Sequence, residues 1–485
     1  MNPIGRRAFL GQMTGATALL AVSRALAATP TTKRPNILFI TADDMNYDAL
    51  GATGCKITGI TPNLDRLAAE GILFRHAHIT CAVCQPSRSV LMTGRYPHRN
   101  GAVGFNAIRD DVPTLQESLA AAGYINGILA KVPHLTPLKK FHWDTVVDAG
   151  QLGNGRSPSL YYQSTKQFIE KAKAAGKPFF LMANSQDPHR PFAGSEQEQG
   201  EKRAAKKKAA ATAGVSRTIR PEEVEVPGFL PDLPPVRKEI AQYYTSVHRC
   251  DETVAEVLRA LKESGLEDNT LVMFLSDNGM AFPFAKTNCY LNSTQTPWIV
   301  RWPGGVAKGQ VDSVHFISGI DFMPTILDAV GVEQVAGMDG RSFLPILEGQ
   351  KQDGRDMVYT VFHETSGRKD YPMRCIQNAK YGYIFNSWSD GKTVFKNESQ
   401  SGLTFAAMQK AAQADERIAA RVKLFLYRVP EEFYDFEKDP NALNNLIDDP
   451  KCAPEIAKMR KAMLDKMMAI GDPLLETFRK YVAQK

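Results

Sequence analysis

The segment 84–95 contains a cysteine, Cys84, and an arginine, Arg88, at a spacing that suits a binding site for an anion. Pro86 suits the first turn of a helix and Gly94 suits a helix end, so the sequence predicts a helix over residues 86–93. Cys84 then lies at the helix N-terminus, where free N–H groups favour anions. Arg88, one turn further on, adds a planar cation that suits an oxyanion. The segment therefore indicates nucleophilic attack on a tetrahedral anion.

Three carboxylates and an amide follow two apolar runs and together form a hard, all-oxygen ligand set. Asp43 and Asp44 follow one run, and Asp277 and Asn278 follow another. Like charges of this kind are buried only with a cation, and oxygen ligands suit Ca²⁺ better than Mg²⁺. Zinc is disfavoured because the paired acids have no nearby histidine or thiolate partner.

The elements that must position these residues are the strands of an α/β sheet. Four apolar runs predict buried strands, and each is followed by polar residues: 36–42, 125–130, 178–183 and 270–276. An Asp after a strand is more often a helix cap or a turn residue. In open α/β sheets, however, ligands bind at the carboxyl ends of strands, so four such ends indicate one shared site. The further polar residues delivered there are Lys131, His134 and His189, and Lys286 is another candidate cation.

Helices are expected between the strands. Thr61 and Pro62 begin one that ends near Gly71, Thr114 and Glu117 form a capping box, and long helices are expected up to Gly176 and over 243–264. Residues 297–302 predict another strand. Beyond about residue 355 shorter strand-like runs, 357–362 and 381–385, precede a helix over 453–470, which predicts a smaller antiparallel sheet. The expected domains are 34–370 and 371–485.

The string Cys84-x-Pro-Ser-Arg88, followed by Thr93-Gly-Arg95, resembles the signature of the type I sulfatases. The resemblance implies that Cys84 is oxidised to Cα-formylglycine, whose hydrate is the nucleophile. It also implies an alkaline phosphatase-like mixed sheet sandwiched by helices, with a smaller C-terminal antiparallel-sheet domain. Cys81 forms a C-x-x-C pair with Cys84, but no second pair exists to complete a zinc site.

The resemblance assigns roles to the candidate residues. It implies one Ca²⁺ held by the four oxygen ligands, Arg88 orienting the formylglycine hydrate, and Lys131 and Lys286 holding sulfate oxygens. His189 resembles the histidine beside the leaving group and would act as general acid. His134 would assist the second step, although the family usually has Lys-x-His where this chain is one residue longer.

Several stretches resemble the N-sulfoglucosamine sulfohydrolases within that family: 178–181 leading into 187–190, 277–279 running to 287–288, and 371–374. We therefore expect cleavage of the N-sulfate of glucosamine in heparin- or heparan-type saccharides. His363, Glu364 and Arg374 are the candidates for binding the sugar. Lys286 stands where those enzymes have arginine, and most other sulfatases have lysine. An O-sulfatase on another glycan, a phosphonate or phosphodiester hydrolase, and a catalytically silent glycan-binding protein remain alternatives.

The N-terminus has the pattern of an export signal. Arg6-Arg7 precede a modestly apolar run, and residues 25–27 form a small-x-small cleavage site, so residues 1–27 are expected to be a twin-arginine signal. An uncleaved anchor is disfavoured because the run is short and rich in Gly, Thr and Ala. The mature protein is then periplasmic or extracellular, and a formylglycine-generating enzyme acts on it before export. No later segment is long and apolar enough to span a membrane.

The chain has 485 residues, of which 43% are hydrophobic, and a formal net charge of +7. Residues 201–220 hold seven Lys or Arg and one Glu, so the rest of the mature chain is close to neutral and nucleic acid is not an expected partner. The basic segment suits either a solvated face, the commoner role, or steering of a sulfated polyanion. A homodimer is left open.

Overall fold

The computed structural model describes residues 34–205 and 214–485, without the side chains of 201–205. The predicted export signal, 1–27, and the centre of the basic segment, 206–213, lie outside the described residues. Residues 34–485 form one compact unit that contains both sheets described below.

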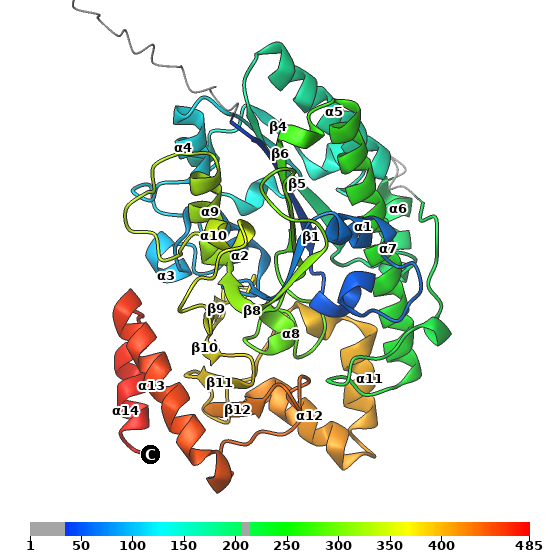
Figure 1. The fold of residues 1–485 in the computed structure, drawn as a ribbon. Coiled ribbons are helices and arrows are strands. Elements are labelled where there is room, and N and C mark those ends of the chain that lie inside the picture. Colours follow the sequence, from blue (N-terminus) through cyan, green and yellow to red (C-terminus); the bar gives the residue numbers. More distant parts are fainter. Residues whose placement is uncertain (1–33, 206–213) are drawn as a thin grey trace, which may run out of the picture. The chain divides into compact units, whose positions relative to one another are not determined.

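The main sheet has eight strands, and the mixed α/β fold expected from the sequence is confirmed (Figure 1). The central strand, β1 (Asn36–Asp43), pairs in parallel with β5 (Phe179–Pro188) on one side and β6 (Thr270–Ser276) on the other. All eight β1 residues are buried, as expected for a strand covered on both faces. The outer strands are β4 (Thr145–Val147), β3 (Ile125–Leu129), β7 (Trp298–Arg301), β2 (Ile72–His78) and β8 (Gln310–Ser318), of which β7 runs antiparallel to both neighbours.

Helices cover the two faces of this sheet. On one face α5 (Pro158–Ala174) and α7 (Pro234–Glu263) pack together and against β5; on the other lie α2 (Cys84–Thr93), α4 (Leu115–Ala121) and α9 (Phe322–Ala329) (Figure 1). The alternation of side chains along β1 divides the core accordingly. Leu38 and Ile40 belong to one apolar cluster, whereas Ile37 and Phe39 belong to the other.

The second sheet is antiparallel and has four strands. In order they are β12 (Glu431–Asp435), β11 (Tyr381–Asn386), β10 (Asp370–Gln377) and β9 (Val358–Glu364). The helix α13 (Ala453–Ile470) packs on β10 and β11 (Figure 1), and the chain ends in α14 (Leu475–Val482). Since β9 begins at Val358, the second sheet starts ahead of the boundary expected near residue 370. Its strand β9 also bonds to the first part of the chain, because Val361 N donates to Thr80 O at 2.8 Å.

Some of the predicted helix termini are confirmed, and others differ from the prediction. The capping box of Thr114 and Glu117 is confirmed, and Gly94 ends α2 in the left-handed region at φ 60°. Thr61 precedes α1 (Pro62–Ala69) but makes no side-chain cap. Instead Asp251 of α7 accepts from Leu64 N at 2.8 Å, so a residue distant in sequence caps this helix. The helix α7 begins earlier than expected, at Pro234 rather than Tyr243.

Candidate functional site

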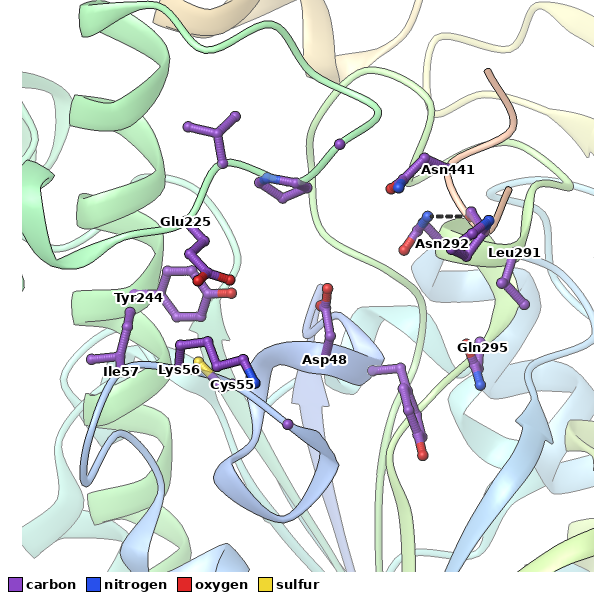
Figure 2. A pocket seen from close by; sticks show the side chains of 16 residues that line it. Asp48, Cys55, Lys56, Ile57, Glu225, Tyr244, Leu291, Asn292, Gln295 and Asn441 are labelled. Atoms are coloured by element: carbon purple, nitrogen blue, oxygen red, sulfur yellow. Dashed lines mark hydrogen bonds between the residues drawn. The ribbon is translucent and has the colours of Figure 1, made fainter. Parts of the chain in front are cut away.

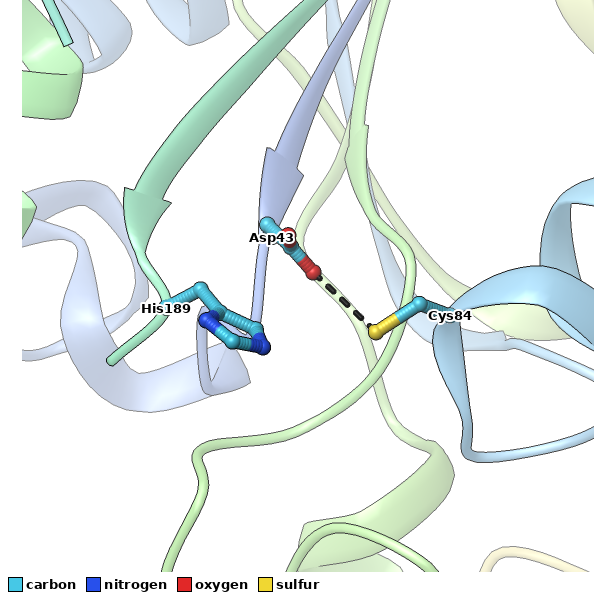
Figure 3. A group of neighbouring side chains, drawn as sticks. All are labelled: Asp43, Cys84 and His189. Carbon is cyan, nitrogen blue, oxygen red and sulfur yellow. Dashed lines mark hydrogen bonds between the residues drawn. The ribbon is translucent and has the colours of Figure 1, made fainter. Parts of the chain in front are cut away.

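Helix α2 begins at Cys84 itself, two residues before the predicted start, because Val83 takes the extended N-cap position and Pro86 falls within the first turn. The Cys84 thiol is buried and donates to Asp43 Oδ1 at 3.3 Å, as Figure 3 shows. Burial raises the pKa of this thiol well above its usual value. An unmodified Cys84 is therefore a protonated thiol, which is a poor nucleophile.

The four predicted oxygen ligands meet at the ends of β1 and β6. Because these strands are paired in parallel register, with Ala42 opposite Ser276, the acids that follow them lie side by side. Asp44 N donates to Asp277 Oδ1 at 3.2 Å, and Asn278 Nδ2 donates to Asp44 Oδ1 at 2.6 Å. Asp44 has a left-handed backbone, φ 68°, which is uncommon for a residue with a side chain and typical of functional sites.

Three cations face these acids. Arg88 Nη2 lies 2.7 Å from Asp277 Oδ2, with both side chains fully buried. Lys131 Nζ contacts Asp43 Oδ2, and Lys286 Nζ lies 2.9 Å from Asp44. The structure therefore brings these acids and cations together beside the carboxyl ends of the strands, where the sequence placed the acids and Lys131.

The residues present fit a divalent cation. Asp43, Asp44 and Asp277 offer oxygens that lie, with the Cys84 sulfur, within 4.8 Å of one another. Within the described part of the chain no donor reaches the buried Asn278 Oδ1. Such an orphaned amide oxygen is a ready ligand.

Charge balance leads to the same conclusion. The three acids and Glu398, which contacts Lys286, outnumber the three cations by one. A divalent ion would make the total positive, as an anion site requires. Without an ion, burial raises the pKa of Asp44 to about 7 against the opposing pull of Lys286, and burial lowers the pKa of Lys131 to about 7.

His189 follows β5 and its ring lies close to Asp43 and Cys84 (Figure 3). Its Nδ1 lies 2.5 Å from Arg190 O; since a carbonyl only accepts, Nδ1 carries a hydrogen. Its Nε2 is thereby left to face the site, 3.2 Å from Glu398 Oε1 and 4.0 Å from Asp44 Oδ2. Burial, followed by Lys286, lowers the pKa of His189 to about 3, while Glu398 opposes this shift.

His134 lies in a short 3-10 turn directly after Lys131, which itself has a left-handed backbone at φ 55°. The ring of His134 packs edge-on against Phe105, with centroids 5.7 Å apart. Burial, and then the charges of Lys131 and Arg88, lower its pKa well below the usual value. The extra residue in this segment therefore leaves His134 within electrostatic range of the site.

The three residues predicted to bind the sugar lie on the neighbouring strands β9 and β10, but their surroundings differ. Arg374 is fully buried on β10, where its guanidinium bonds to both oxygens of Asp472 at 2.7 and 3.0 Å and to two backbone carbonyls. A guanidinium engaged in this way cannot also hold a saccharide, so the predicted role of Arg374 is corrected to a structural one. The sequence could not reveal that Asp472, which follows α13, covers it.

His363 and Glu364 are adjacent on β9, so their side chains point to opposite faces. The ring of His363 lies near His98, with centroids 6.4 Å apart. Glu364 abuts the loop that carries Phe105: a Cβ on Gly104 would lie only 2.2 Å from its Oε1. Of the three candidates for binding the sugar, Glu364 therefore lies beside the loop whose Phe105 contacts His134.

Sequence reasoning missed several residues that position the site. Asn184 Oδ1 accepts from Arg88 Nη1 at 2.5 Å, and Asn184 Nδ2 donates to Leu129 O at 3.0 Å. The available signal for it was an amide directly after the apolar run 178–183. Arg156 bonds to Asp187 and to His189 O, at 3.1 and 3.0 Å. Glu398 gave no signal at all, because it reaches the site from the chain's distant C-terminal part.

A separate cavity of about 360 Å³ lies elsewhere, lined by polar side chains that include Asp48, Lys56, Glu225 and Asn292 (Figure 2). None of the predicted catalytic or metal-binding residues lines it. Among the described residues, no helix combines the length and apolar character that a membrane span requires.

The fold and this arrangement define a class of protein: an α/β enzyme whose buried acids and cations surround a residue at a helix N-terminus, suited to an oxyanion. The chain belongs to the sulfatase family, whose model matches residues 35–332. Residues 281–394 match the C-terminal model of the N-sulphoglucosamine sulphohydrolases.

Relatives extend over nearly the whole chain. It is 30% identical to the human N-sulphoglucosamine sulphohydrolase over 470 residues, covering 90% of this chain and 91% of that protein. It is 28% identical to an ulvan-active sulfatase of Formosa agariphila, covering 92% of this chain and 82% of that protein. A solved structure described as a complex with its substrate D-glucosamine-2-N,6-O-disulfate shares the fold, with a TM-score of 0.68, 19% identity and coverage of 91% and 99%. These relatives define a sulfuric ester hydrolase.

Proposed function

We propose that the protein hydrolyses the N-sulfate of glucosamine in heparin- or heparan-type saccharides. The observation that carries the proposal is the convergence on Cys84 of three buried acids and three cations, a set suited to a metal ion and a sulfate. The match to the N-sulphoglucosamine sulphohydrolase C-terminal model and the 30% identical human relative support the glucosamine N-sulfate.

We infer that Asp43, Asp44, Asp277 and Asn278 hold Ca²⁺ and that Cys84 is converted to Cα-formylglycine. Calcium would neutralise the acids and attract a sulfate oxygen, and the formylglycine hydrate would supply an oxygen nucleophile. The protonated state of an unmodified Cys84 supports this conversion, because the thiol itself attacks poorly.

The cationic residues then bind and orient the sulfate. Arg88 is held rigidly by Thr41, Asn184 and Asp277. Its guanidinium is therefore preorganised beside the candidate metal ligand Asp277, as electrostatic catalysis requires. Lys131 and Lys286 pair with different acids, Asp43 and Asp44, and would meet different sulfate oxygens.

His189 would donate a proton from Nε2 to the departing nitrogen, since Nδ1 is engaged with Arg190 O. A bound sulfate anion would raise the pKa of His189 from its low value and so favour the protonated form. His134 would assist the later release of sulfate. Maturation by a formylglycine-generating enzyme and export through residues 1–27 complete the proposal.

The deciding experiment measures sulfate release from matched N-sulfated and O-sulfated glucosamine disaccharides, with a phosphate diester as a third substrate. We expect release from the N-sulfated compound, and none from any substrate with C84A. Intact mass spectrometry of the peptide that contains Cys84 should show the lower mass of formylglycine. An unmodified peptide together with inactivity would indicate a glycan-binding protein instead.

An O-sulfatase is the second candidate. Lys286 favours it, because lysine at this position resembles most other sulfatases, and so does the ulvan-active relative. Faster release from the O-sulfated disaccharide would establish it.

A further inference from the structure

One segment from the C-terminal part of the chain lies against the catalytic residues. We name residues 397–404 the strap; it contains the 3-10 turn Glu398–Ser401 and the start of α11 (Leu403–Ala411). At its beginning Asn397 Nδ2 donates to Thr287 Oγ1 at 2.5 Å. At its end Leu403 N and Thr404 N donate to Glu239 at 3.0 and 2.7 Å. The strap is therefore anchored on both sides.

The second anchor connects the strap to the catalytic histidine's neighbour. Glu239 on α7 accepts from Arg190 Nη1 at 2.6 Å, and Arg190 directly follows His189. The fit is tight: a Cβ on Gly402 would lie 2.2 Å from Glu239 Oε1 and 2.5 Å from Arg190 Nη2. A side chain at this position would have to displace the ends of Glu239 and Arg190, so glycine allows the strap to approach them closely.

Between the anchors, Glu398 bridges two residues of the site. Its Oε2 lies 2.8 Å from Lys286 Nζ and its Oε1 lies 3.2 Å from His189 Nε2. Glu398 is 28% exposed whereas Lys286 is 2% exposed, so the carboxylate closes the outer side of the site. Burial opposes the ionisation of Glu398, but Lys286 and His189 outweigh it and hold its pKa below the usual range.

We propose that Glu398 is a positioning residue: when His189 is protonated, Glu398 accepts from its Nε2 while pairing with the Lys286 ammonium, and so holds the Nε2 proton at the side of the bound sulfate where the leaving group receives it. The proposal rests on the proposed sulfatase function and assigns to that site a residue from outside the main α/β sheet. One carboxylate thus contacts both partners at once, in addition to the contact of Lys286 with Asp44 and of His189 Nδ1 with Arg190 O.

The test compares two leaving groups in E398Q and the wild type. The amine or alcohol of a saccharide is a poor leaving group that needs a proton when its bond to sulfur breaks, whereas 4-nitrocatechol sulfate releases a stabilised phenolate that needs little help. If Glu398 orients His189, E398Q should lose roughly 10- to 100-fold in kcat on the saccharide, part of the about 10²–10⁴ of a general acid. Its loss on 4-nitrocatechol sulfate should be at least about tenfold smaller.

Three variants complete the test. In an H189N background E398Q should add no leaving-group dependence, because the residue through which it acts is gone. E398D, which keeps the charge but is shorter, should fall between E398Q and the wild type. E416Q, on the exposed start of α12 (Glu416–Tyr427), is the matched control and should behave as the wild type.

Equal losses of E398Q on both substrates, or no loss, would overturn the positioning role. If E398Q does not fold, G402A supplies the same comparison, since it shifts the strap while leaving Glu398 in the chain. A wild type inactive on every sulfate would instead refute the proposed function, so the two failures are distinguishable.

Discussion

Arg88 Nη2 and Asp277 Oδ2 form a 2.7 Å ion pair in which neither side chain is exposed. Removing one partner of such a pair leaves a buried charge uncompensated, which typically costs about 3–5 kcal/mol. We therefore expect R88A to lower the free energy of unfolding by about that amount in urea titrations with a chelator present.

The matched control is R109A, which removes an exposed pair with Asp111 whose side chains are 49% and 72% exposed. Its effect should be within about 1 kcal/mol. If R88A and R109A lose similar amounts of unfolding free energy, other groups compensate the Asp277 charge when Arg88 is removed, and the prediction is wrong.

The cluster of oxygen ligands predicts stabilisation by calcium. A ligand that binds only the folded state stabilises by about 2.7 kcal/mol at a hundredfold excess over its Kd. We expect a chelator to lower the melting temperature and calcium to restore it. D277N should lose this response because it removes a ligand charge, whereas a calcium response kept by D277N would argue against the site.

His78 predicts how stability changes with pH. It is fully buried on β2, and burial lowers its pKa to about 3. Because the unfolded state then binds more protons, stability is fully present above about pH 6.5 and is lost as the pH falls toward 3.

H78Q should flatten this slope in unfolding experiments by up to about 1.4 kcal/mol per pH unit. The exposed His142 provides the control, and H142Q should retain the wild-type slope. An unchanged slope in H78Q would mean that other groups dominate acid unfolding.

Variants of Arg374 and Glu364 distinguish a structural role from a role in substrate binding. R374A should destabilise by about 3–5 kcal/mol, because it strands the buried Asp472. E364Q should leave stability nearly unchanged and raise KM for the saccharide roughly tenfold, as loss of a charged hydrogen bond would. A raised KM with normal stability for R374A would restore its predicted role in sugar binding.

The main sheet and much of the site could be predicted from the sequence, because both depend on local pattern. The runs that became β1 and β6 are apolar throughout, and parallel pairing necessarily brings the residues after them together. Cys84 and Arg88 were accessible for the same reason, since they lie one turn apart at the start of a helix whose proline and glycine mark its ends.

What could not be predicted depends on contacts across long sequence separations. Arg374 was misassigned because its partner Asp472 lies 98 positions away. Glu398 lies 112 positions from Lys286 and was not found at all. No periodicity or motif encodes such a contact; only the packing of the second sheet brings these residues into place.

The hydrogen bond from Val361 to Thr80 joins β9 to the segment that leads into the nucleophile position. Together with the strap, this bond ties the C-terminal part of the chain to the segments around the candidate reaction centre. A fragment that ends after the larger sheet would therefore lack Glu398 and the bond to Thr80. The two sheets consequently have to be expressed and engineered as one chain.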